Sequence, residues 1–122
     1  MSFNRPIVDQ IILDVGAEAF GRLAKLFMDE TVVEIDAIEA LAADMRNLGE
    51  LGRRAHSLKN AAGSFGLASL AAVARELETA CDSANAPEVA RSASRLRGAW
   101  LTGRPALHNL VDEISQRPGG QP

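Results

Sequence analysis

The chain has 122 residues, which is the size of one small domain. Hydrophobic residues make up 47% of it and aromatic residues 4%, so a packed domain is expected, whereas a base-stacking RNA module or an aromatic-lined ligand pocket is not. The formal net charge of −3 disfavours nucleic-acid binding, which needs clustered excess lysine and arginine.

The first third of the chain predicts two helices. Residues 6–13 are typical of a short helix with proline in its first turn, and Gly16 ends it. From residue 17 to residue 43 apolar side chains recur at 3.6-residue spacing, which predicts one long helix. Its buried stripe would comprise Phe20, Leu23, Ala24, Phe27, Thr31, Ile35, Ile38, Leu41 and Ala42. The other side is acidic and is expected to face water, with Asp29, Glu30, Glu34, Asp36 and Glu39.

The next two predicted helices form a pair. Asn47 and Glu50 have the spacing of a capping box, so a helix should begin there. It runs to Gly66, where a glycine suits a left-handed stop. Apolar residues from 67 to 84 predict the following helix. Cys81 falls on its apolar stripe, which indicates a small core residue rather than a reactive thiol.

The last predicted helix begins after Asn85, which can cap it. Pro105 lacks an N–H, so a kink or a break is expected near it. Four long amphipathic segments with short connections close most simply as an all-α, antiparallel up-down-up-down four-helix bundle, here with a short N-terminal helix. We expect this bundle over residues 1–115 and a flexible C-terminal tail over residues 116–122.

The sequence also predicts a cellular setting. A single cysteine cannot form an internal disulfide, so a reducing cytoplasm is the natural compartment. Neither a signal peptide nor a membrane span is predicted. The motifs of hydrolases and nucleotide-binding proteins are missing, and two histidines argue against a multi-histidine metal site. The second of them, His108, has Asp112 four residues on and is interpreted as part of a surface pair without function.

His56 lies at the edge of its helix's apolar stripe, so its imidazole is expected to reach solvent. Glycine inside a helix costs about 0.5–1 kcal/mol relative to alanine, so glycines beside His56 suggest that a bulky group approaches it closely. The alternative is that they let a neighbouring helix pack tightly. At about 100° per residue, its neighbours on this face are Gly49, Gly52, Arg53, Lys59, Asn60, Gly63 and Gly66.

Glu78 is a candidate hydrogen-bond acceptor for the imidazole. Antiparallel helices joined near Gly66 pair positions about equally far from the turn, and His56 and Glu78 are ten and twelve residues away. A nucleophilic histidine attacks with one bare nitrogen while an acceptor holds the proton on the other. Lys59, one turn along, could neutralise phosphoryl oxygens on the ring. The alternative for Glu78 is a solvated surface acid.

The stretch AHSLKNAAGSFGL from Ala55 to Leu67, followed by Leu70 and by Leu77-Glu78, resembles the signature of histidine-containing phosphotransfer (HPt) domains. The resemblance implies a four-helix bundle whose exposed histidine takes a phosphoryl group from a receiver-domain aspartate and passes it to another.

By this resemblance His56 is phosphorylated through Nε2, Lys59 assists the phosphate, Glu78 orients the ring, and Gly63 keeps the approach open. Asn60 departs from the pattern, because HPt domains very often have glycine there, and its bulk would affect steric access or the range of receivers accepted.

The charge around His56 agrees with docking to an acidic receiver site. Four cations (Arg46, Arg53, Arg54 and Lys59) against one acid give 4 − 1 = +3 from residue 46 to residue 59. The alternative is that Arg46 and Arg54 are ordinary surface arginines. Access and partner docking are assigned to Gly52, Arg53, Asn60 and Gly63.

The expected function is that of a monomeric phosphocarrier without an ATP-binding or kinase catalytic region, and hence not an enzyme. Its expected partners are response regulator receiver domains and a hybrid sensor kinase. No metal or cofactor of its own is expected, because Mg²⁺ would sit on the receiver. The alternatives are a non-phosphorylated helical adaptor that binds a receiver or kinase, and a homodimerising helical module.

Overall fold

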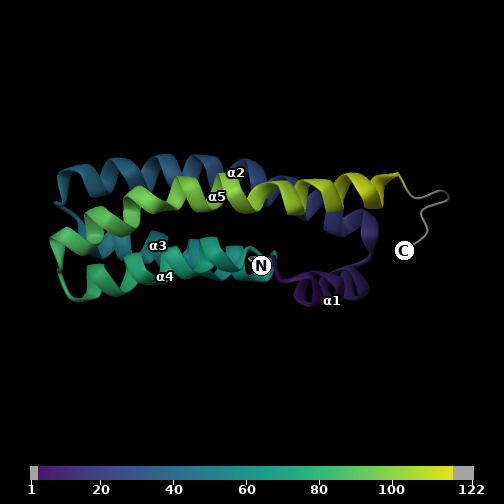
Figure 1. The fold of residues 1–122 in the computed structure, drawn as a ribbon, viewed down its shortest axis with the longest axis horizontal. Coiled ribbons are helices and arrows are strands. Elements are labelled where there is room, and N and C mark those ends of the chain that lie inside the picture. The colour runs from purple at the N-terminus through teal and green to yellow at the C-terminus, as the bar shows by residue number, and fades with distance from the viewer. Residues whose placement is uncertain (1–2, 117–122) are drawn as a thin grey trace.

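The computed structural model describes residues 3–116, and these form five α-helices joined by short connections (Figure 1). The helices are α1 (Arg5–Val15), α2 (Ala17–Asp44), α3 (Leu48–Ser64), α4 (Ala68–Asp82) and α5 (Ala86–Ser115). The β-bridge in this part of the chain is an isolated antiparallel contact between Phe3 and Leu67. The all-α prediction is therefore confirmed. Of the predicted tail, residues 117–122 lie outside the described residues, and Gln116 is the C-cap of α5.

The four long helices form the predicted up-down-up-down bundle. Each packs against the next one in sequence, and α5 returns beside α2 to close the ring (Figure 1). Connections of three residues, at 45–47, 65–67 and 83–85, leave the chain no route except an antiparallel return.

Helices α2 and α5 extend together past the ends of α3 and α4 (Figure 1). At about 1.5 Å per residue, the 28 residues of α2 span roughly 42 Å and the 17 residues of α3 roughly 26 Å. Helix α1 lies beside this extension and packs against α2, with Val8 fully buried. The segment before α1 is tied to the α3–α4 turn, because the Asn4 N–H donates to the Gly66 carbonyl at 2.7 Å. Helix α1 thus covers apolar surface that α3 and α4 are too short to reach.

The aromatic side chains gather in the core. Phe27 stacks on Phe65 with ring centres 4.6 Å apart and meets Trp100 edge-on at 6.0 Å. Cys81 is buried, as predicted. Its burial raises the pKa of the thiol, which keeps the unreactive protonated form. Leu23 is 45% exposed, so the buried stripe of α2 is narrower than the sequence suggests.

Local end signals act as the sequence predicts. The Asn47 Oδ1 accepts a hydrogen bond from the Glu50 backbone N–H at 3.0 Å, and the Asn85 Oδ1 accepts one from the Glu88 backbone N–H at 3.3 Å. Gly66 has a left-handed backbone with φ of +79° just beyond α3.

Of the kink or break expected near Pro105, the break is wrong, because α5 runs through this residue as one helix. The carbonyl that loses its N–H donor belongs to Leu101, which is 55% exposed, so water can replace that donor. Trp100 and Leu107 are buried on either side of the proline and fix both halves of the helix in the core.

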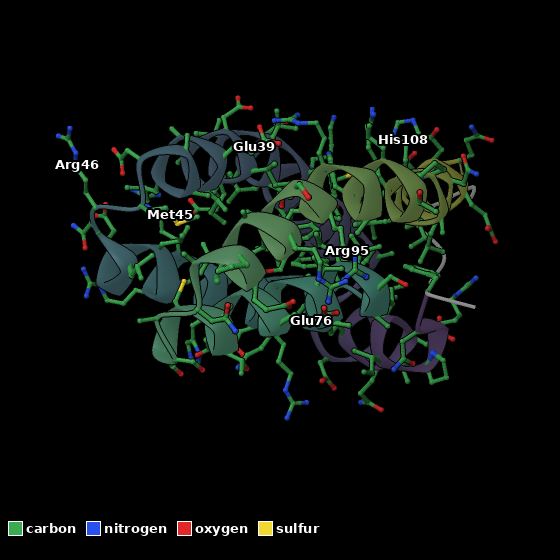
Figure 2. The ribbon with its side chains drawn as sticks, turned by 60° about the vertical axis from the view of Figure 1, so that its left-hand side comes forward. Glu39, Met45, Arg46, Glu76, Arg95 and His108 are labelled. Carbon is green, nitrogen blue, oxygen red and sulfur yellow. The ribbon has the colours of Figure 1, made fainter. Side chains whose placement is uncertain are left out.

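The acidic side of α2, which the sequence predicts to be a solvated face, also forms ion pairs with neighbouring helices. Glu34 pairs with Arg54 of α3, whose Nη1 lies 3.1 Å from its Oε2. Asp36 and Glu39 both pair with Arg97 of α5. A further ion pair of this kind joins α4 to α5, where Arg95 meets Glu76 at 2.8 Å (Figure 2). Sequence periodicity assigns these carboxylates to a face but does not show that arginines from other helices reach it.

Candidate functional site

His56 projects from α3 at its border with α4. Leu51, Ala55, Leu58 and Ala62 turn the apolar side of α3 into the core, and His56 follows that stripe by one residue. Its side chain is 52% exposed. The imidazole is therefore anchored on a rigid helix and open to an approaching molecule.

Glu78 of α4 holds one ring nitrogen. Its Oε2 lies 2.7 Å from the Nδ1 of His56, which connects the two helices across 22 residues of sequence. A carboxylate can only accept, so Nδ1 carries the proton of this hydrogen bond. In the neutral ring, Nε2 is then left with its lone pair, which is the state that a nucleophilic imidazole requires.

Lys59 completes a chain of three side chains. Its Nζ donates to the other oxygen of Glu78, Oε1, at 2.8 Å. The hydrogen bond from Lys59, together with that from His56, lowers the pKa of Glu78 below its usual value, against the opposing effect of burial. Glu78 is thus kept as a carboxylate that can both hold the ring proton and balance positive charge.

Asn60 meets the second ring nitrogen. Its side-chain Nδ2 lies 3.2 Å from the Nε2 of His56, one helical turn away. The sequence interpretation considered only the bulk of this residue. The four-residue spacing from His56 was the available signal for the hydrogen bond, since such pairs meet on a helix surface.

The glycines near His56 fall into two kinds. A Cβ on Gly52 would lie 3.3 Å from the Cβ of Cys81 on α4, so this glycine lets the two helices approach closely. For Gly52 the structure favours the helix-packing alternative over the access interpretation. A Cβ on Gly63 would have no neighbour within 4 Å, so packing within the described protein does not explain that glycine.

The predicted basic patch is smaller than the sequence count indicates. Arg54 turns toward α2 and pairs with Glu34, and Lys59 pairs with Glu78. Arg46 lies in the α2–α3 connection at one end of the bundle (Figure 2). Arg53 is exposed on α3 and remains the candidate docking cation beside His56.

Other features of the described residues do not indicate a further site. His108 lies far along α5 from the α2–α3 connection (Figure 2), with its Nε2 3.4 Å from the Oδ2 of Asp112 in an exposed pair. Across residues 3–116, no group of three His, Cys, Asp or Glu side chains is placed to hold a metal ion. None of the described helices has both the length and the apolar character needed to cross a membrane.

Comparison with known proteins agrees with this geometry. The family model described as Hpt domain matches residues 22–117, which includes α2 from Arg22 onward and all of α3, α4 and α5. No curated protein and no solved structure matches the chain significantly. The match covers most of the chain, and the chain therefore belongs to the Hpt domain family, whose members act as phosphocarriers in the histidine phosphotransfer of phosphorelays.

Proposed function

We propose that this protein carries a phosphoryl group on Nε2 of His56, which it takes from the phosphoaspartate of one receiver domain and gives to the aspartate of another. The observation that supports this most directly is the hydrogen bond of 2.7 Å between Glu78 and the Nδ1 of a half-exposed His56. It favours the tautomer in which Nδ1 carries the proton and Nε2 keeps its lone pair.

In the proposed step the Nε2 lone pair attacks the phosphorus of the acyl phosphate. The Nε2–P bond forms, the P–O bond to the aspartate breaks, and that electron pair stays on the carboxylate oxygen. The proton remains on Nδ1, so the ring gains a positive charge. Glu78, already bonded to Nδ1, stabilises that charge. The reverse step regenerates the neutral ring.

Lys59 and the open side of α3 serve the incoming group in this proposal. The Lys59 ammonium lies one turn from His56 and can share its donors between Glu78 and phosphoryl oxygens. Gly63 leaves space for the partner, and Arg53 supplies positive charge toward an acidic receiver site. Mg²⁺ would be held by the receiver, and response regulators and a hybrid sensor kinase are the proposed partners.

The test is phosphoryl transfer from a panel of phosphorylated receiver domains to the wild-type protein and to His56→Gln. We expect rapid labelling of the wild type in an acid-labile, base-stable form, and none of His56→Gln. His108→Gln is the matched control, because it removes the other histidine and should label like the wild type.

A second candidate is a helical adaptor that binds a receiver or kinase without carrying phosphate. It is favoured by the Asn60 amide, which occupies the lone pair of Nε2. Receivers that bind the wild type but label it no more than His56→Gln would support the adaptor and contradict the phosphocarrier.

A further inference from the structure

Both nitrogens of the His56 ring are engaged. Glu78 holds Nδ1 at 2.7 Å, and the Nδ2 of Asn60 lies 3.2 Å from Nε2. Because Nδ1 already donates its proton to a carboxylate, Nε2 in the neutral ring can only accept, and the Asn60 amide must be the donor. A hydrogen bond from that amide uses the Nε2 lone pair, which is also the electron pair that must attack phosphorus.

We propose, building on the phosphocarrier function, that the Asn60 amide changes partners during transfer. Before transfer it donates to Nε2 and shields the lone pair. During transfer this hydrogen bond breaks, the Nε2–P bond forms, and the P–O bond to the donor's aspartate breaks with its electrons left on that carboxylate. Afterwards the freed amide donates to a phosphoryl oxygen. No proton changes atoms in this sequence.

The position of Asn60 allows this exchange. Its side chain is exposed, and its backbone belongs to the same helix as His56, so the amide stays near the ring when it rotates off Nε2. The Lys59 ammonium is already bonded to Glu78, so the amide offers a donor that is not tied to that carboxylate. A phosphoryl oxygen is a charged acceptor and binds an amide N–H more strongly than a neutral ring nitrogen does. A glycine at this position would supply no donor in either state.

The exchange slows both the gain and the loss of the phosphoryl group. Breaking the hydrogen bond to Nε2 slows phosphorylation, and the new bond to the phosphoryl group slows its loss. One ordinary hydrogen bond corresponds to about a twofold to tenfold change in a rate. Asn60→Gly should therefore be phosphorylated about two to ten times faster than the wild type and should lose the group to water faster by a similar factor.

The variant Asn60→Leu separates the effect of side-chain bulk from the effect of hydrogen bonding, because leucine is of similar size but has no donor. Both variants are treated with phosphoramidate, a small phosphodonor that needs no protein partner, and the half-life of the phosphohistidine is then measured. The half-life should be shorter than the wild type's in Asn60→Leu as well as in Asn60→Gly. A half-life in Asn60→Leu equal to that of the wild type would show that only bulk matters and would overturn the proposal.

A second readout concerns the unphosphorylated protein. The ¹⁵N resonance of Nε2 should move when Asn60→Leu removes the donor, while Nδ1 should remain protonated. An unmoved Nε2 resonance would overturn the proposed hydrogen bond.

These measurements distinguish a failure of the Asn60 exchange from a failure of the proposed phosphocarrier function. If receivers do not label the wild type but phosphoramidate does, the phosphocarrier role fails and the Asn60 exchange is still decided. If receivers label the wild type while the Asn60 variants match it in rate and half-life, only the exchange fails.

Discussion

Glu78 accepts hydrogen bonds from two side chains that lie on adjacent turns of α3. Its two oxygens therefore have different roles. One accepts the hydrogen bond from the His56 ring, and the other holds the Lys59 ammonium in place. A neutral side chain of the same shape would keep some of this geometry but would not balance the positive charge. The charge of Glu78 is therefore the property to test.

Because the pKa of Glu78 is lower in the folded protein than in the unfolded chain, the unfolded state binds the proton more readily. The stabilisation by this carboxylate is then complete above the ordinary pKa of glutamate and is lost as the pH falls through the lowered pKa. Urea unfolding of the wild type and of Glu78→Gln across this range should give a stability difference that shrinks toward acid. A difference that grew in acid would contradict the assignment. Glu76→Gln is the matched control, because Glu76 lies on the same helix as Glu78 and its carboxylate pairs with Arg95 of α5.

At the scale of the helices, α3 and the turn after it carry two glycines that differ in whether a larger side chain would fit. Gly63 has free space where a side chain would begin. Gly66 has a left-handed backbone, and a Cβ there would lie 2.8 Å from Val8 and 2.9 Å from the Asn4 carbonyl oxygen. The first position tolerates a methyl group in the free protein, and the second cannot accept one without moving the N-terminal segment.

Gly63→Ala should stabilise the protein by about 0.5–1 kcal/mol, because alanine is the better helix former. In the proposed function it should also slow phosphoryl transfer from receivers, since the methyl group stands where the partner approaches. Chemical denaturation and transfer rates are the measurements. Gly98→Ala, in the interior of α5 and likewise with open space at the Cβ position, should also stabilise the protein but leave the transfer rate unchanged. Equal transfer rates in both variants would remove Gly63 from the access role.

Gly66→Ala should destabilise the protein by about 1–3 kcal/mol, because a left-handed alanine is strained and its methyl group displaces the segment before α1. Denaturation midpoints at constant m-value are the measurement. A loss no larger than about 0.5 kcal/mol, the range of ordinary surface substitutions, would show that this segment does not depend on the glycine.

At the scale of the whole molecule, most of the fold and part of the site could be predicted from sequence, since many of the signals are local. Asn47 and Asn85 cap helices through neighbouring backbone, and the short connections fix the antiparallel order. What the sequence could not give depends on packing between distant segments. The pairing of Arg97 with the acids of α2 joins residues about 60 apart in sequence, and Pro105 is kept in a continuous helix by its buried neighbours.

The reacting face and one set of cross-bundle contacts lie on different helices. His56, Asn60 and Glu78 belong to α3 and α4, joined by three residues, whereas Trp100 and Arg97 tie α5 to α2. A hairpin of such neighbouring helices assembles from short-range contacts. Substitutions at these contacts between α2 and α5 can therefore change the resistance of the fold to heat or proteolysis. The reacting face on α3 and α4 then stays the same. Through the contacts between α2 and α5, the stability of the bundle can therefore change independently of the reactivity of His56.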